Sequence, residues 1–115
     1  MNSKEIIKTA IDALEDKKAE NICIIDISEI STLADYFIIT NGSNRSQVQA
    51  LADSVSEKMA KAGATIKQTE GYNNANWILL DYSDIVIHIF DKESRSFYDL
   101  ERIWQDGKFI TCDQF

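Results

Sequence analysis

The chain contains no proline and only two cysteines, and it has no repeat, low-complexity run or linker-like segment. The cysteines, Cys23 and Cys112, fit no metal-binding or redox spacing, so neither a disulfide framework nor a cysteine-based metal site is indicated. No apolar run approaches the roughly 18 residues that a membrane-spanning helix needs. The N-terminal residues lack the basic and long apolar regions of a signal peptide, so we expect a single cytoplasmic domain over residues 1–115.

Positive charge is also scarce in this sequence. Acidic residues outnumber basic ones by 19 to 12, which gives a net charge of −7. Nucleic-acid binding draws most of its affinity from Lys and Arg side chains that neutralise phosphates, so little direct contact with nucleic acid is expected. An acidic surface instead speeds the encounter with basic proteins. The composition therefore favours a partner protein of positive charge.

The segment 77–90 organises the rest of the chain. It consists of two short apolar runs, rich in β-branched and aromatic residues, on either side of the polar residues 81–84. This pattern predicts a β-hairpin. A two-residue loop at its tip would place Trp77 opposite His88 on the neighbouring strand.

The two faces of this hairpin differ, because side chains alternate across a strand. One face is aliphatic and is expected to pack against helices; it carries Ile78, Leu80, Ile85, Ile87 and Ile89. The other face mixes large rings, a histidine and two carboxylates; it carries Trp77, Leu79, Asp81, Asp84, Val86, His88 and Phe90. We interpret the mixed face as a surface that the fold leaves uncovered for a partner.

The remaining elements complete an α/β pattern. Helices are expected over residues 3–18, 43–62 and 97–104, the last capped by Ser94 or Ser96 with Phe97 and Trp104 in the core. Strands are expected over 22–27, 35–40 and 64–70, the third parallel to the second, polar and near a sheet edge. Residues 105–115 show no periodicity. The order predicts one mixed sheet of about five strands with flanking helices.

Several segments resemble motifs of the ribosomal silencing factor family, also called Iojap-like proteins. These are residues 34–39, Gly42 with residues 47–50 and 52–53, residues 77–82 and 84–90, and Arg95 with residues 97–102 and Trp104. They follow the family's order and span nearly the entire chain. Ser83 stands where the family usually has glycine, Arg45 precedes the usual place of the helix-opening arginine, and Gln105 begins a segment usually led by glycine.

The resemblance implies a non-enzymatic protein with a nucleotidyltransferase-like topology that lacks the catalytic residues, and with no cofactor or metal. It further implies binding to a basic protein, conventionally numbered fourteen, on the joining face of the large ribosomal subunit. A member bound there would sterically prevent docking of the small subunit and so repress translation. Family members also tend to form homodimers when free.

Chemical interpretations of individual residues have weaker support than this binding role. His88, the only histidine, has no cysteine, histidine or carboxylate at ligand spacing, which favours a half-buried side chain beside Trp77. Asp81 and Asp84 lack a third metal ligand; the sequence ranks solvation and partner contact equally, and the resemblance favours contact. The predicted partner-binding residues are Trp77, Leu79, Asp81, Tyr82, Asp84, His88, Phe90, Tyr98 and Glu101.

One enzymatic alternative depends on Gly42 and Ser43, because glycine and serine at a helix start can hold phosphate. A nucleotidyltransferase would also need a closely spaced Asp-x-Asp for metal ions, and the following segment supplies none. We therefore favour glycine as a strand terminator and serine as a cap. An atypical or vestigial nucleotide-binding protein is the alternative function.

Overall fold

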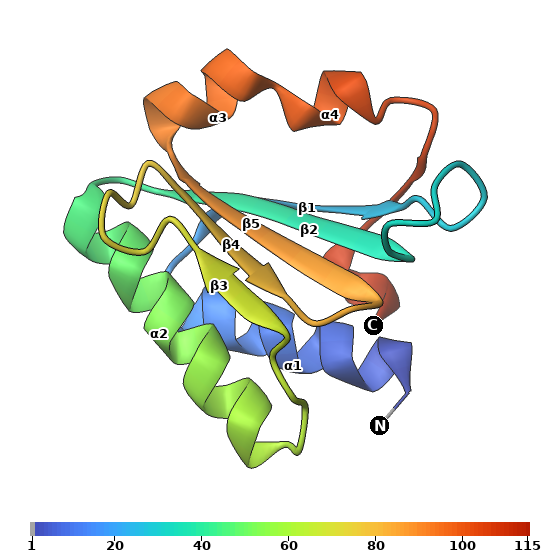
Figure 1. The fold of residues 1–115 in the computed structure, drawn as a ribbon, viewed down its shortest axis with the longest axis horizontal. Helices are drawn as coiled ribbons and strands as arrows, with labels where there is room; N and C mark the ends of the chain where they lie inside the picture. Colours follow the sequence, from blue (N-terminus) through green and yellow to red (C-terminus); the bar gives the residue numbers. More distant parts are fainter. Residues whose placement is uncertain (1) are drawn as a thin grey trace.

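Over residues 2–115, which the computed structural model describes, six strands form one mixed sheet with helices on both faces (Figure 1). The strands are β1 (Glu20–Asp26), β2 (Tyr36–Gly42), β3 (Gln68–Glu70), β4 (Trp77–Asp81), β5 (Ile85–Asp91) and β6 (Lys108–Ile110). The helices are α1 (Ser3–Asp16), α2 (Arg45–Lys61), α3 (Lys92–Tyr98), α4 (Leu100–Ile103) and the 3₁₀ helix η1 (Cys112–Gln114). None of these helices is long and apolar enough to span a membrane.

The strand order is β3-β4-β5-β2-β1-β6, with β2 and β5 parallel and every other neighbouring pair antiparallel. The predicted mixed sheet is thus confirmed. The sixth strand, β6, comes from the tail and pairs with β1. The polar strand β3 lies at an edge with all its residues exposed, as expected, but it is shorter than predicted and pairs with β4.

Local capping chemistry sets the ends of the two long helices. The Asn2 side chain accepts a hydrogen bond from the Glu5 amide at the start of α1, and Asn44 accepts one from Gln47 at the start of α2. Such caps satisfy amides that have no partner inside the helix. Gly63 follows α2 with φ of +89°, a conformation in which glycine costs least. Both predicted helices are confirmed.

Two apolar cores lie on opposite faces of the sheet. The aliphatic face of the hairpin packs against α1 and α2, and all five of its predicted residues are buried. The mixed face packs against the segment that contains α3 and α4, where Phe90 is 0% exposed and Val86 is also buried. The expectation that the mixed face stays uncovered is therefore wrong over β5, because the chain after β5 folds back onto it (Figure 1).

The predicted hairpin register is also wrong. Trp77 pairs with Phe90 and Leu79 with His88, so the strands are offset by two residues from the expected pairing. The loop is three residues long, and Ser83 at its centre adopts φ of +71°. Since an offset of two preserves the alternation, both face assignments survive for the strand residues. Tyr82, however, is buried with the aliphatic core on the opposite side of the sheet.

The last helical region begins earlier than predicted and is divided. Helix α3 starts at Lys92, where Asp91 rather than Ser94 or Ser96 is the cap and accepts a hydrogen bond from the Ser94 amide at 2.8 Å. Asp99 then adopts a left-handed conformation, with φ of +48°, that separates α3 from α4. This break turns Phe97 outward, so the prediction that Phe97 packs in the core is wrong.

Candidate partner-binding surface

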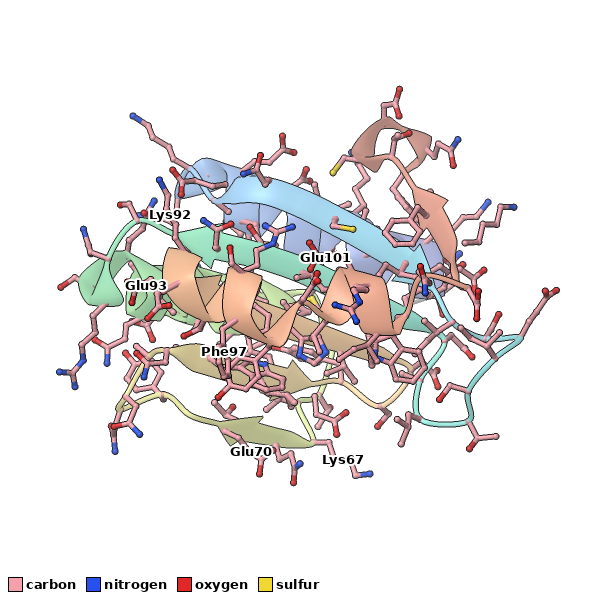
Figure 2. The ribbon with its side chains drawn as sticks, turned by 90° about the horizontal axis from the view of Figure 1, so that it is seen from above. Lys67, Glu70, Lys92, Glu93, Phe97 and Glu101 are labelled. Atoms are coloured by element: carbon pink, nitrogen blue, oxygen red, sulfur yellow. The ribbon has the colours of Figure 1, made fainter. Side chains whose placement is uncertain are left out.

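Helices α3 and α4 lie across the middle of the sheet and leave β3 beyond their edge (Figure 2). Four neighbouring apolar side chains from β4 and α3 form a surface that we call the aromatic strip: Trp77, Leu79, Phe97 and Tyr98. Phe97 is 81% exposed, Tyr98 is partly exposed, and Trp77 and Leu79 are half-buried. Exposed apolar patches of this kind commonly mark interaction surfaces.

Ring packing fixes the shape of the aromatic strip. The Trp77 ring centroid lies 4.7 Å from that of Tyr98 and 5.0 Å from that of the buried Phe90, and Phe97 packs edge-on against Tyr98 at 5.1 Å. Aromatic pairs at such separations are favourable beyond the area that they bury. The strip is therefore preorganised, with Phe90 as its floor.

A shallow cavity of about 250 Å³ adjoins the strip and is lined by Glu70, Gly71, Trp77 and Leu79. A Cβ atom on Gly71 would lie 2.1 Å from the carbonyl oxygen of Trp77, so only glycine permits this close approach. Gly71, which follows β3, thus lies against the start of β4, while β3 itself pairs with residues 79–81. It adds a depression beside the indole ring.

Trp77 is hydrogen-bonded to His88 beneath the strip. The indole Nε1–H donates to His88 Nδ1 at 3.1 Å, which requires the neutral imidazole with its proton on Nε2. His88 is 4% exposed, and this burial lowers the pKa of His88 to about 4. The imidazole is therefore neutral at physiological pH, and its burial prevents direct contact with a partner.

The carboxylates of the hairpin tip lie at the other end of β4. Asp81 is half-buried and accepts a hydrogen bond from the Ser83 amide at 2.8 Å, whereas Asp84 is exposed. Neither forms an ion pair within residues 2–115, and no group of three or more metal-ligating side chains gathers in that part of the chain. Both carboxylates can accept a cationic group from outside.

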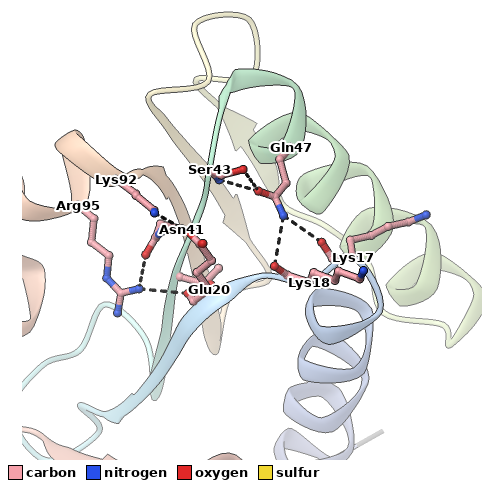
Figure 3. A network of polar contacts seen from close by, with 9 residues as sticks. Lys17, Lys18, Glu20, Asn41, Ser43, Gln47, Lys92 and Arg95 are labelled. Carbon is pink, nitrogen blue, oxygen red and sulfur yellow. Dashed lines mark hydrogen bonds and ion pairs between the residues drawn. The ribbon is translucent and has the colours of Figure 1, made fainter.

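Glu101 is directed elsewhere. Its carboxylate pairs with Arg95 at 3.2 Å, and the same guanidinium donates to Asn41 Oδ1 at 2.8 Å and to the Glu20 carbonyl oxygen at 3.4 Å. Figure 3 shows Arg95 joined to Asn41 and Glu20, with Lys92 beside Glu20. This network ties α3 and α4 to β1 and β2, so Glu101 supports the helices internally.

Replacing Arg95 with alanine is expected to lower the free energy of unfolding by about 2 kcal/mol, because it leaves the half-buried Glu101 and the buried Asn41 without the guanidinium donor. Chemical denaturation of the two proteins measures this difference. A matched control is Lys92→Ala, which removes an exposed lysine from the same helix and should change stability by less than about 0.5 kcal/mol. Equal losses in both variants would contradict a structural role for the Arg95 network.

Gly42 and Ser43 have local structural partners. The Ser43 amide and hydroxyl both donate to Gln47 Oε1, at 2.6 and 2.7 Å, and Gln47 Nε2 donates to the carbonyl oxygens of Lys17 and Lys18 (Figure 3). Donors that would cradle a phosphate are thereby occupied by a side chain. The arrangement joins α2 to the end of α1 and gives the nucleotide-binding alternative no support.

The structure brings together only part of the predicted partner-binding set. Trp77, Leu79 and Tyr98 share the aromatic strip, while Asp81 and Asp84 lie at the far end of β4. Phe90 and His88 lie beneath the strip, Tyr82 faces the opposite core and Glu101 is paired internally. Phe97 and the 66% exposed Ile103 were missed as surface residues, because their helical spacing is that of a buried stripe.

These features define a small α/β domain, covered by helices on both faces, whose α3–α4 side carries an exposed aromatic strip. The chain belongs to the ribosomal silencing factor family: the family model described as "Ribosomal silencing factor during starvation" matches residues 1–115. The family resemblance read from the sequence is thus confirmed.

Individual relatives match over most of this chain. The ribosomal silencing factor RsfS of Bacillus subtilis is 42% identical over 113 residues, covering 98% of this chain and 96% of the relative. A crystal structure of a Chromobacterium violaceum protein superposes with a TM-score of 0.89 at 39% identity, covering 91% of this chain and 88% of that one. A mouse protein named "Mitochondrial assembly of ribosomal large subunit protein 1" is 27% identical over 108 residues, covering 90% of this chain and 47% of its own.

Proposed function

We propose that this protein is a non-enzymatic translational repressor that binds the large ribosomal subunit in the cytoplasm. The proposed contact is a basic protein on the joining face of that subunit, the one conventionally numbered fourteen. An occupied joining face cannot receive the small subunit, so repression needs no chemical step. Membership in the ribosomal silencing factor family supports this proposal.

The observation that carries the proposal is the exposed aromatic strip on the α3–α4 side. Large aromatic side chains dominate the binding energy of protein interfaces when they are desolvated in well-packed surroundings. Trp77 and Tyr98 meet that description, because they are held against each other and against Phe90. The opposite side of the sheet is covered by the two long helices, whose apolar stripes are turned inward.

Charge supports a basic partner. The chain carries a net charge of −7, and within residues 2–115 neither Asp81 nor Asp84 pairs with a cation. Lysine or arginine from the partner would give these carboxylates the counter-charge that the fold does not supply. In this proposal the strip supplies affinity, and the acids raise the association rate with little direct contact to ribosomal RNA.

The proposal is tested by sedimenting the protein with purified large and small subunits separately, followed by a subunit-joining assay. It predicts co-sedimentation with the large subunit alone and a dose-dependent loss of joined ribosomes. Co-sedimentation with neither subunit would contradict it. We also propose that the free protein is a homodimer, which mass measurement by light scattering checks with and without the large subunit.

Neutralising the hairpin tip with Asp81→Asn and Asp84→Asn should reduce the association rate with the large subunit about threefold to tenfold at low salt, with a smaller effect at high salt. Asparagine at position 81 retains an oxygen for the Ser83 amide, so the turn is preserved. Stopped-flow mixing at several salt concentrations measures the rate.

The matched control is Asp12→Asn with Glu15→Gln, which removes two exposed charges from α1 on the other side of the sheet and leaves the same net charge. The control should keep an association rate close to that of the original protein. If both double variants slow association equally, the effect comes from the net charge of the protein, and the position of the acids at the hairpin tip does not matter.

A further inference from the structure

We infer that His88 is a positioning residue for partner binding. It fixes the indole of Trp77 by accepting a hydrogen bond from the indole N–H, and it does not contact the partner. This inference rests on the proposed function, since it concerns the same surface. It assigns a task to a side chain that lies beneath the surface.

The geometry leaves His88 a single polar contact. Nδ1 accepts from the Trp77 indole at 3.1 Å, and Nε2 has no hydrogen-bond partner within residues 2–115. A buried polar side chain with an unpartnered atom is costly, so its presence calls for a compensating role. The ring of Phe37 lies edge-on to the imidazole at 4.6 Å, and Phe90 stacks at 6.4 Å. Aromatic neighbours thus confine the imidazole on two sides.

Trp77 occupies the boundary between the core and the aromatic strip. It is half-buried, with Phe90 below it and Tyr98 beside it. A tryptophan side chain at such a boundary has alternative rotamers, and ordering it on binding would cost affinity. The hydrogen bond to His88 selects one orientation before the partner arrives. The strip is therefore held ready in the free protein.

The same hydrogen bond determines what the indole can offer a partner. Because Nε1–H points inward to His88, the exposed part of the Trp77 ring presents only carbon atoms. The partner group that sits on it should be apolar, or the aliphatic stem or planar head of a lysine or arginine. A hydrogen-bond acceptor on the partner cannot bind the indole N–H, because that N–H already donates to His88. This selectivity agrees with a basic partner.

The test compares two substitutions at one position. His88→Asn retains an acceptor oxygen where Nδ1 stood, whereas His88→Leu fills a similar volume without an acceptor. We expect the leucine variant to bind purified large subunits about tenfold more weakly, as for the loss of one buried hydrogen bond. The asparagine variant should stay within about threefold of the original protein, even though its smaller side chain makes it less stable.

A double-mutant cycle separates positioning from general support. Trp77→Phe keeps a ring but has no N–H, so it should also weaken binding by about tenfold. In that background His88→Leu should cost less than about twofold more, because the contact is already gone. Indole N–H resonances give a second readout: the Trp77 signal should move in the leucine variant and stay close to its place in the asparagine variant.

The outcomes distinguish failure of the His88 positioning role from failure of the proposed docking surface. Full binding by His88→Leu, or fully additive losses in the cycle, overturns the positioning role of His88. If Trp77→Ala also binds large subunits as tightly as the original protein, the aromatic strip is not the docking surface and the proposed function fails as well. If Trp77→Ala loses binding while His88→Leu keeps it, only the role of His88 is rejected.

Discussion

Lowering the pH from 7 to 4 is expected to cost this protein about 3 kcal/mol of stability through His88 alone. The pKa of His88 is lowered by burial from 6.5 to about 4 in the folded protein. Between these two values the unfolded chain binds a proton that the folded protein does not, so protons favour unfolding. Stability from this source is complete above pH 6.5 and falls as the pH approaches 4, by about 1.36 kcal/mol per pH unit.

Carboxylates also titrate near pH 4, so the effect of His88 has to be isolated by subtraction. His88→Asn provides the reference, because asparagine does not titrate and leaves every other ionisable group in place. Urea denaturation at several pH values should show the original protein losing about 3 kcal/mol more than this variant between pH 7 and pH 4. Parallel losses in the two proteins would mean that His88 is protonated without penalty and that its burial is wrong.

Replacing Trp77 with alanine is expected to weaken binding to the large ribosomal subunit by a hundredfold or more, about 3 kcal/mol. Trp77 connects the strip to the core beneath it, since its ring centroid lies 4.7 Å from that of Tyr98 in the strip and 5.0 Å from that of the buried Phe90. Truncation removes a large ring and also loosens Tyr98. Equilibrium sedimentation with purified large subunits measures the loss, and thermal unfolding confirms that the variant is folded.

Phe109→Ala is the matched control for that experiment. Phe109 is an exposed aromatic residue, 50% accessible, on β6 at the opposite edge of the sheet from β3 and β4. Its removal takes away a similar ring without touching the aromatic strip, so affinity should change by less than about threefold. Loss of binding in the control alone would place the docking surface on the β6 edge.

Much of the fold follows from local patterns. The caps at Asn2 and Asn44 and the apolar stripes of α1 and α2 are short-range features, and each was predictable from residues a few positions apart. The aliphatic face of the hairpin was predictable for the same reason, since alternation depends on the strand alone. These elements account for the sheet and the helices on one of its faces.

The errors concern long-range packing and turn chemistry. The sequence of the hairpin predicts an open mixed face, because no residue within it indicates that α3 and α4 fold back over it. His88 and Phe90 became buried through that return of the chain. The predicted register is wrong because the loop has three residues and Ser83 within it adopts a positive φ. Residues other than glycine rarely adopt a positive φ, so the sequence does not indicate this loop.

The candidate site was therefore predictable in part. Trp77, Leu79 and Tyr98 were identified from residue type and face, and they do share one surface. Phe97 was assigned to the core on its helical spacing, but the left-handed Asp99 divides the helix and leaves Phe97 exposed. The sequence indicates Arg95 only as part of a family motif, because its partners on β1 and β2 lie 54 or more residues away in sequence.

Hydrogen–deuterium exchange of the protein, free and bound to the large ribosomal subunit, tests the central claim most directly. Binding to the subunit is expected to slow exchange in β3 and β4 and in α3 and α4, around the aromatic strip. Amides on the outer side of α1 and α2 should exchange at the same rate in both states. Protection confined to α1 and α2, with β4 and α3 unchanged, would contradict the account.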